Sequence, residues 1–272
     1  MEYEIRPRQK IGLNISEVWE YRELFFFLTW RDIKIKYKQT YLGAAWAILQ
    51  PLLLMVIFTF VFPIRNDQEI GSCPYPVFFF IGLLIWNVFS SGVSNAGLSM
   101  VNNSNIIKKV YFPRLIIPTS AILSALVDFA ISFGFLIVLF IYYHQLSLLP
   151  ALLLRLPLAI VVTFLTTAGL GFLISALSIK YRDFRYIVPF MLQMLFFLSP
   201  VIYPVHHFED KRIQAVLSLN PISGMIEFYR SSVTHTTVDF TIILYSVIAS
   251  VVIFLAGLIY FRKTEYYFAD LA

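Results

Sequence analysis

Residues 115–143 read LIIPTSAILSALVDFAISFGFLIVLFIYY, and Asp128 is the one charged residue in this run. A helix needs about 20 consecutive apolar residues to cross the hydrocarbon core of a bilayer. The run is longer than that, so it predicts one helix that crosses a membrane.

The sequence predicts six such spans in all. Besides 115–143 as the third span, we expect helices at 44–63, 75–98, 148–179, 186–204 and 240–261. The fold class is therefore an all-α polytopic membrane protein with six transmembrane helices. We divide it into a cytoplasmic N-terminal segment, residues 1–43, and a single six-helix transmembrane domain, residues 44–272.

The composition of the 272-residue chain agrees with this fold class. Hydrophobic residues make up 59% of the chain and charged residues 14%, whereas soluble domains have about 45–50% and about 25%. A soluble fold of this size cannot hide such an excess in its core. The composition therefore excludes a soluble enzyme, a disordered regulator and, with Cys73 as the single cysteine, a disulfide scaffold.

Basic residues predict the orientation, because they concentrate in cytoplasmic segments. With the N-terminus inside, sixteen of the 21 Lys and Arg residues fall in cytoplasmic segments. The outer segments contain only Arg65, Lys211, Arg212 and Arg230. We expect both termini in the cytoplasm, and the net charge of +5 needs no nucleic-acid partner.

Asp128 is a functional candidate, because an ionisable residue inside a membrane span is costly and is seldom placed there without a role. Arg155 lies in the fourth span, at a depth that differs from that of Asp128 by roughly 15 Å at the rise of an α-helix. We therefore expect Asp128 to hydrogen-bond to a serine or threonine inside the bundle, and Arg155 to extend outward to the membrane surface.

The stretch before the first span has the pattern of an amphipathic interface helix. Its apolar residues follow one helical stripe, and they are Phe26, Trp30, Ile33 and Tyr37. Its basic residues on a different side are Arg31, Lys34 and Lys38. We expect the aromatic rings to face membrane lipids and the basic groups to face headgroups or a partner. The alternative is a surface anchor with no further role.

The segment 205–239 is too polar to cross the membrane and too apolar for a free loop. Asn220 and Pro221 resemble an N-cap followed by proline at the first helical position. We expect two short re-entrant helices, 210–219 and 221–232, that dip into the outer leaflet. Such an element suits the outer gate of a pathway, with Asn220, Pro221, Glu227 and Arg230 as candidates. A packed external cap without a gating role is the alternative.

Catalytic and cofactor motifs are poorly represented in the sequence. The cluster at 206–210 (HHFED) matches no common metal-ligand spacing, so we expect no metal site. Segment 257–264 only superficially resembles a phosphate-binding loop, because Arg262 replaces the second glycine and no strand precedes it. We therefore expect no nucleotide site and no cofactor in this chain.

Aromatic residues are plentiful, with 27 Phe, 16 Tyr and 4 Trp. Aromatic rings stack on sugars, and they also form ordinary lipid-facing surface and interfacial belts. The candidates for a channel wall are Trp46, Phe58, Phe62, Phe190, Phe196, Phe197 and Tyr203.

Three groups of residues together resemble one known family. The first comprises 17–24 (EVWEYREL), 30–43 (WRDIKIKYKQTYLG), Trp46 and Gln50–Pro51, and the second comprises 109–114 (KVYFPR) with Pro118. The third comprises 181–183 (YRD), 188–190 (VPF), Gln193, 199–204 (SPVIYP) and Asn220–Pro221. The chain resembles the permease subunit of ABC-2 type polysaccharide exporters, which move O-antigen, capsule or teichoic acid chains, and it is most similar to the O-antigen branch.

The resemblance implies a transport subunit in the bacterial inner membrane rather than an enzyme. It implies a homodimer with two copies of a cytoplasmic ATP-binding subunit, which holds the ATP and Mg. The implied substrate is a glycan on undecaprenyl diphosphate, exported through a channel between protomers. Two alternatives stay open: an ABC-2 permease for another amphiphile, and a membrane enzyme of glycan assembly with an essential Asp128 or Asp183.

The resemblance also implies roles for particular residues. The segment 107–114 would couple to the ATPase, with Tyr111 and Phe112 as apolar contacts beside Pro113, and with Lys108, Lys109 and Arg114 pairing to acids. Leu42 and Gly43 would form the tight connection into the first span, where glycine permits a sharp turn. Arg182 and Asp183 would form the inner gate, unless they form a simple salt bridge at a helix end. The carrier headgroup, or else anionic lipid, would meet Trp30, Arg31, Lys34, Tyr37 and Lys38.

Overall fold

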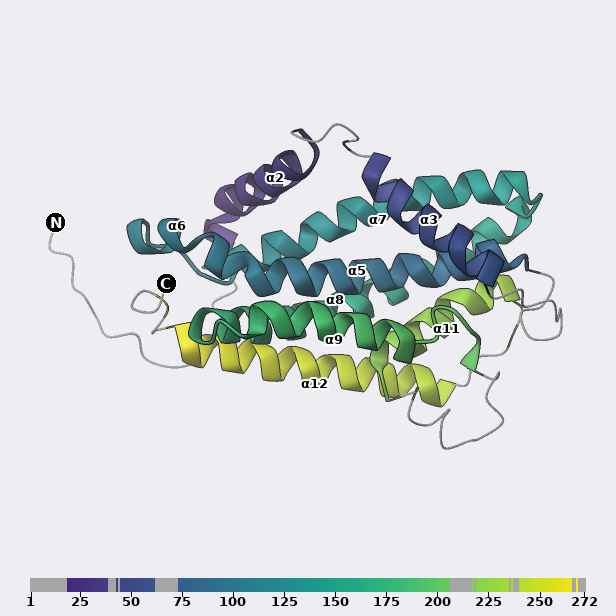
Figure 1. Cartoon of the computed structure of the whole chain (residues 1–272). Helices are drawn as coiled ribbons and strands as arrows, with labels where there is room; N and C mark the ends of the chain where they lie inside the picture. Colours follow the sequence, from purple (N-terminus) through teal and green to yellow (C-terminus); the bar gives the residue numbers. More distant parts are fainter. Residues whose placement is uncertain are drawn as a thin grey trace, which may run out of the picture.

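The computed structural model describes residues 19–38, 43, 45–61, 73–205, 217, 219–234, 236, 240–265 and 268. All regular elements in these residues are helices, and the long ones run side by side (Figure 1). Four helical segments within the described residues are long and apolar enough to cross a membrane. They are α5 (Tyr75–Asn102), α7 (Ile116–Tyr142), the 3-10 turn η1 (Leu146–Leu148) continued by α8 (Leu149–Lys180), and α12 (Phe240–Thr264).

Two shorter apolar helices lie where the first and fifth spans were predicted. They are α3 (Ala45–Val61) and α9 (Phe184–Leu198), of 17 and 15 residues, and each contains a proline. The predictions for spans two, three, four and six are confirmed as helices of spanning length. That α3 and α9 also cross the membrane stays a prediction.

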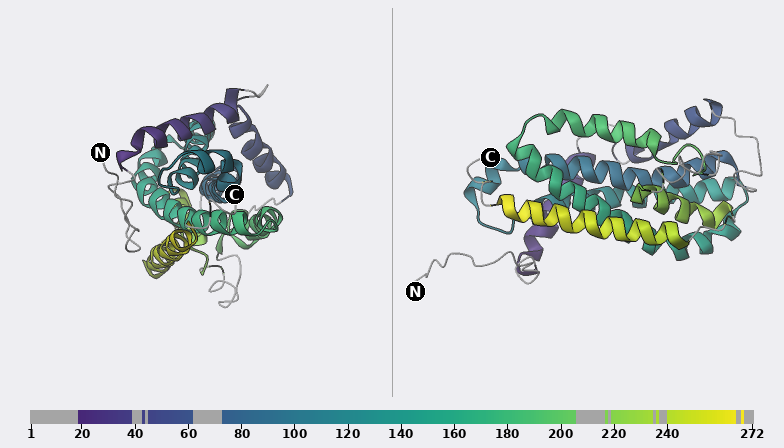
Figure 2. Two further views of the ribbon diagram at one scale, coloured as in Figure 1. Left: turned by 90° about the vertical axis from the view of Figure 1, so that its left-hand side faces the viewer. Right: turned by 90° about the horizontal axis from the view of Figure 1, so that it is seen from below.

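Helix α5 forms the centre of the bundle. Every residue from Val77 to Trp86 is buried, and the helix packs against α7, α8 and α11 (Pro221–Thr234). Viewed along the bundle axis, the other helices surround it (Figure 2). A helix that is apolar all round is typical of such a central position.

Helices α8 and α12 cross at two glycines. A Cβ atom at Gly169 would lie 2.6 Å from the backbone carbonyl carbon of Ile253, and one at Gly257 would lie 2.7 Å from the backbone carbonyl carbon of Gly169. Next to this crossing, Thr166 Oγ1 and Ser250 Oγ form a hydrogen bond of 2.8 Å. Small residues and hydroxyl contacts of this kind let two helices approach closely within a membrane.

The two ends of the bundle differ. One end, here called the α6 end, carries α6 (Ser104–Lys109) and the loop that follows it, and α2 (Arg22–Lys38) packs beside it along α7 (Figure 1). The other end carries α11, which is almost completely buried against α5, α8 and α12. The predicted helix 210–219 falls almost entirely outside the described residues, apart from Leu217 and Leu219.

Two local predictions are confirmed by backbone geometry. Asn220 Oδ1 accepts a hydrogen bond of 3.1 Å from the backbone N–H of Ile222, so Asn220 caps α11 with Pro221 at the first helical position. Gly43, between α2 and α3, has φ of 48°, in the left-handed region that favours glycine. Leu42 lies outside the described residues.

Candidate functional site

Helix α2 packs on the bundle with a different side from the predicted aromatic stripe. Leu28 is its one buried residue, and Leu24 and Phe25 pack into the same apolar cluster. Phe26 and Trp30 are 70% and 50% exposed, in keeping with a lipid-facing position. The side of α2 that faces the bundle is therefore apolar at residues 24–28, and it becomes polar toward the C-terminal end of the helix.

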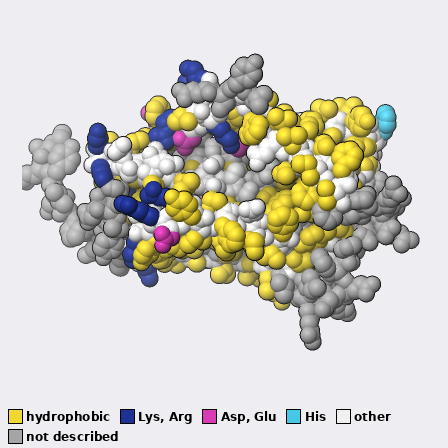
Figure 3. Space-filling model, viewed as in Figure 1, with side chains coloured by type: hydrophobic (Ala, Val, Ile, Leu, Met, Phe, Trp, Pro, Cys, Tyr) yellow, Lys and Arg dark blue, Asp and Glu magenta, His cyan; other side chains and the backbone are white. Residues whose placement is uncertain are grey.

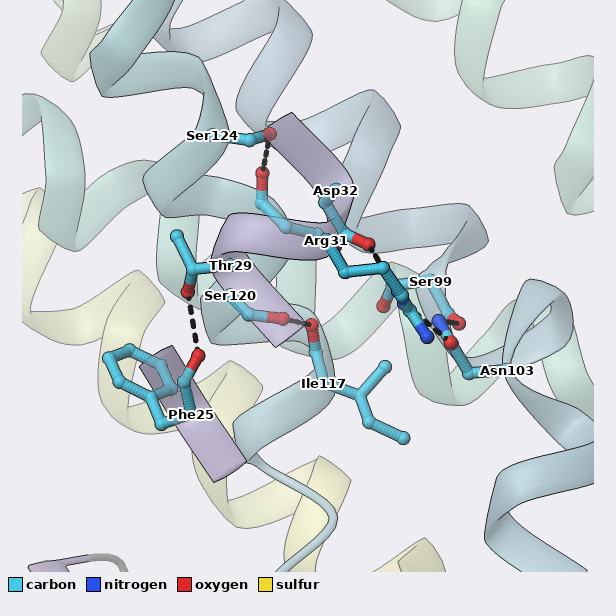
Figure 4. Close-up of polar contacts among 10 residues, drawn as sticks. Phe25, Thr29, Arg31, Asp32, Ser99, Asn103, Ile117, Ser120 and Ser124 are labelled. Atoms are coloured by element: carbon cyan, nitrogen blue, oxygen red, sulfur yellow. Dashed lines mark hydrogen bonds and ion pairs between the residues drawn. The ribbon is translucent and has the colours of Figure 1, made fainter. Parts of the chain in front are cut away.

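Arg31 turns toward α5 rather than toward a headgroup. Its guanidinium donates hydrogen bonds to Asp32 Oδ1 and to Asn103 Oδ1, each of 2.8 Å (Figure 4). Lys34 is exposed, with Nζ 5.8 Å from the centroid of the Trp30 ring, and Lys38 is exposed too. Of the three basic residues predicted to face a headgroup, only Lys34 and Lys38 keep that exposure.

Asp128 has partners that the sequence did not indicate. Lys36 Nζ and the hydroxyl of Tyr37 both donate hydrogen bonds to its carboxylate. The expectation of a serine or threonine partner is therefore wrong, because α2 lies along α7 and reaches its midpoint. Tyr37 accordingly faces the protein and not lipid, and burial together with the Asp128 carboxylate raises the pKa of its phenol.

Two cavities with polar side chains in their walls adjoin Lys36, which lines both. The first cavity, of about 510 Å³, lies near the α6 end between α2, α5 and α7. The second cavity, of about 620 Å³, lies deeper between α3, α5 and α7, and Asp128 lines it. Charged side chains gather toward the α6 end of the molecule, and the opposite end is largely apolar (Figure 3).

In the predicted coupling segment 107–114, some residues are exposed and others are buried. Val110 and Tyr111 are 57% and 66% exposed, whereas Phe112 is 4% exposed and Pro113 is buried. Lys108 and Lys109 are exposed. Phe112 therefore does not project as an apolar contact, and Val110 takes its place beside Tyr111.

Arg114 is held inside the chain by the C-terminal segment. It donates through its guanidinium to the backbone carbonyl of Glu265, and its backbone N–H lies 3.3 Å from Glu265 Oε1. Arg262 pairs with the same carboxylate at 2.9 Å, and Phe268 packs between Phe261 and the Arg114 guanidinium. The Arg114 guanidinium thus binds a backbone carbonyl of its own chain, where the sequence predicted an acid of a partner.

The predicted inner-gate residues are exposed between α8 and α9. Arg182 and Asp183 lie in the turn that begins α9, and neither side chain forms an ion pair with a described residue. The alternative of a salt bridge between these two neighbours is not what the described residues show.

The predicted channel aromatics fall into separate groups. Phe58 and Phe196 have ring centroids 6.1 Å apart and meet Phe79 and Trp86 where α3, α5 and α9 converge. Phe190 and Phe197 are exposed on α9, and Trp46 is half-exposed beside the second cavity. Tyr203 donates to the backbone carbonyl of Phe197 at 2.8 Å. Phe62 lies outside the described residues.

The outer-gate candidate Arg230 is 1% exposed. Its Nε donates to the carbonyl of Phe78 at 3.0 Å, and its two terminal nitrogens donate to the carbonyls of Pro200 and Val201. The guanidinium also stacks 3.8 Å from the centroid of the Phe78 ring and fits against Gly82, where a side chain would collide with it. Arg230 thereby fastens α11 to α5 and to the turn after α9.

Two more polar contacts hold α11 in place. Glu227 accepts a hydrogen bond of 3.2 Å from the backbone N–H of Val205. Arg155 of α8 donates to Ser231 Oγ and stacks on the ring of Phe228 at 5.7 Å. The expectation that Arg155 extends to the membrane surface is therefore wrong, because α11 lies within its reach.

These helices define a multi-pass membrane protein built around a buried α5, with an exposed loop at one end and the short buried helix α11 at the other. Residues 23–234, more than three quarters of the chain, match the family described as ABC-2 type transporter, and the chain belongs to that family. ABC-2 permeases work with an ATP-binding subunit, so the chain is a transport subunit rather than a catalytic one.

The curated relatives agree with this family. The chain is 30% identical over 218 residues to an O-antigen export system permease protein of Myxococcus xanthus, covering 80% of this chain and 82% of the relative. It is 28% identical over 263 residues to an O-antigen export system permease protein of Klebsiella pneumoniae, covering 96% and 98%. A polysialic acid transport protein of Escherichia coli is 24% identical over 207 residues, covering 75% and 78%.

Proposed function

We propose that the chain is the channel-forming permease of an ATP-driven exporter of lipid-linked polysaccharide, of the O-antigen kind. The observation that carries the proposal is the similarity to an O-antigen export permease from end to end, over 96% of this chain and 98% of the relative. In this proposal α3 and α9 complete six spans, both termini are cytoplasmic, and the membrane is the bacterial inner membrane.

The proposed assembly is a homodimer with two copies of an ATP-binding subunit, which supplies ATP and Mg. The loop 110–111 supports this, because Val110 and Tyr111 expose apolar surface at the α6 end, directly after the exposed basic residues Lys108 and Lys109. An apolar contact with a basic rim suits docking into a groove lined by acids. This chain itself needs no cofactor for the proposed role.

The proposed substrate is a glycan on undecaprenyl diphosphate. On the lipid side of α2, Lys34 and Lys38 would meet the anionic headgroup, since both are exposed and basic groups at an interface attract anionic lipid. Arg182 and Asp183 would flank the inner entrance, and α11 would close the outer end.

Deleting the gene in its own host and restoring it from a plasmid tests the function. We expect deletion to remove polysaccharide from the cell surface while lipid-linked polysaccharide accumulates inside. Plasmid-borne wild-type chain should reverse both effects, but not in a strain whose partner ATPase lacks its P-loop lysine. Normal surface polysaccharide after deletion would contradict the proposal, and loss of glycan synthesis itself would favour the enzyme alternative.

A further inference from the structure

The two cavities beside Lys36 share one polar wall. Residues Asn87, Ser91 and Asn95 follow one another at intervals of four along α5, so they lie on one face of the helix. Asn87 and Ser91 line the second cavity and Asn95 lines the first. Helix α5, which is apolar from Val77 to Trp86, thus turns a row of polar side chains toward both cavities. The hydroxyl of Ser91 donates to the backbone carbonyl of Asn87, so the amides of Asn87 and Asn95 are the groups in this row that a bound molecule can use.

The charged groups in the cavity walls compensate one another. Arg31 pairs with Asp32 at 2.8 Å, and Lys36 pairs with Asp128. The walls therefore have two positive and two negative side chains and are close to neutral overall. An anionic ligand would have to displace a carboxylate from its partner, which leaves that carboxylate uncompensated. A neutral ligand leaves both pairs intact.

The walls also offer unused hydrogen-bonding groups. The side-chain amides of Gln50, Asn87 and Asn95 have no hydrogen-bond partner among the described residues, and each amide can donate and accept. Ser132 donates its proton to the carbonyl of Ala47 at 2.9 Å, which leaves its oxygen as an acceptor. This mixture matches hydroxyl groups, which themselves donate and accept.

An aromatic ring completes the second cavity. Trp46 of α3 lines it and is 50% exposed, so its ring is accessible to a bound molecule. A ring beside several amides can cover the apolar face of a sugar while the amides bind its hydroxyls. The volumes of about 620 and 510 Å³ fall within the range of about 300–1,000 Å³ that small-molecule sites occupy.

We propose that the two cavities bind neutral sugar units of the exported chain within a single protomer, on α5 between α2, α3 and α7. The inference rests on the proposed function, since it assigns a place to the glycan of that transport reaction. A lipid acyl chain is a poorer occupant, because it would leave the amides of Gln50, Asn87 and Asn95 without partners.

Photo-crosslinking in the host tests the site directly. A benzophenone amino acid replaces Gln50 in the second cavity, Val252 on the outer face of α12, or Phe197 on α9. Each variant is first shown to restore surface polysaccharide, so the proposed function is judged separately from the site. Cells with radiolabelled polysaccharide are then irradiated, and the purified chain is analysed for attached glycan.

We expect a glycan adduct at position 50 and none at position 252. An adduct at position 197 alone would place the sugar path elsewhere, and a phospholipid adduct at position 50 would make the cavity a lipid site. Either result, or no glycan adduct in variants that export, overturns the site and leaves the proposed function standing.

Matched substitutions give a second measurement. Asn87→Leu and Ser91→Val remove polar groups from the wall, and Ser147→Val makes the same serine-to-valine change in the exposed turn η1. We expect at least a tenfold loss of surface polysaccharide for Asn87→Leu and a smaller loss for Ser91→Val, at wild-type levels of chain in the membrane. Wild-type export by both cavity variants would overturn the proposal.

Discussion

Lys36 of α2 donates a hydrogen bond to the carboxylate of Asp128, 92 positions away and halfway along α7. The contact joins a helix that packs along the outside of the bundle to a spanning helix at mid-depth. It also adjoins both cavities, since Lys36 lines each of them.

The Lys36–Asp128 pair should show coupling in a double-mutant cycle. The lysine side chain is 40% exposed, so solvent weakens the pair. We expect Asp128→Asn to cost about 1 kcal/mol rather than the roughly 3–5 kcal/mol of breaking a fully buried pair. Lys36→Met combined with Asp128→Leu should cost less than the two single changes together, measured by thermal unfolding in detergent. Strict additivity would mean that the two residues do not interact.

Arg230 should be essential for a folded chain. Arg230→Ala removes the donors to the carbonyls of Phe78, Pro200 and Val201 and leaves a cavity. Arg230→Lys should fail too, because an ammonium cannot reproduce the planar fork of donors. We expect both variants to be degraded or to aggregate, which membrane fractionation and size-exclusion chromatography would detect. Arg182→Ala, at an exposed position, serves as the control that keeps wild-type levels.

Gly82→Ala should reproduce the Arg230 defect from the opposite side of the contact. A methyl group at residue 82 would lie 2.6 Å from Cζ of Arg230, and the buried guanidinium has no room to move. Gly134→Ala is a matched control on α7, because a Cβ there meets no atom within 4 Å. Chromatography of both variants decides the matter: equal recovery would show that the guanidinium is not held tightly against α5.

Substitution of Tyr111 by alanine should affect export, whereas substitution of Phe112 by alanine should affect stability. Phe112 is buried, so Phe112→Ala should lower stability by about 3–5 kcal/mol. Tyr111 is exposed, so Tyr111→Ala should leave the melting temperature unchanged and reduce ATP-dependent export. The check pairs thermal unfolding in detergent with surface polysaccharide. If Phe112→Ala lost export but kept the stability of the wild-type chain, Phe112 would act in docking to the ATPase, as the sequence predicted.

Cys73 should not react with thiol reagents near neutral pH. It is 3% exposed, and burial raises the pKa of its thiol to about 12 against the opposing effect of the Arg230 charge. A raised pKa keeps the group in its neutral form until the pH approaches 12, so the thiolate that reacts is scarce at pH 7–8. We expect no maleimide labelling of the native chain in folded membranes, and full labelling after denaturation.

Because Cys73 is not expected to react, the orientation of the chain can be measured without replacing this cysteine. Lys109→Cys and Leu219→Cys place single reactive thiols at exposed positions near opposite ends of the bundle. An impermeant maleimide added to intact spheroplasts should label residue 219 and spare residue 109. The reverse pattern would invert the predicted topology.

The helices were predictable because their signals are local. Apolar runs set their approximate bounds, Asn220 with Pro221 marked the start of α11, and Gly43 marked the turn before α3. These features depend on residues a few positions apart, whose physical preferences do not need the rest of the fold.

The contacts were harder to predict because they join distant segments. Lipid and a protein interior are both apolar, so the aromatic stripe of α2 did not reveal which side packs on the bundle. The partners of Asp128 and Arg31 depend on how α2 is rotated about its own axis against the bundle. The spacing of residues in the sequence does not determine that rotation. Phe112 was misjudged for a similar reason, since a short loop presents one ring and buries the next.

The contacts of Arg114 with Glu265 and Phe268 have a consequence for biosynthesis. Glu265 is synthesised 151 positions after Arg114, and Phe268 follows it, yet both support the loop near residues 110–114. A nascent chain that has reached only α11 therefore lacks these supports, and the loop acquires its native setting only after α12 and the residues that follow it have been made. The order of synthesis itself thus delays the docking surface until residues 265–268 have been added.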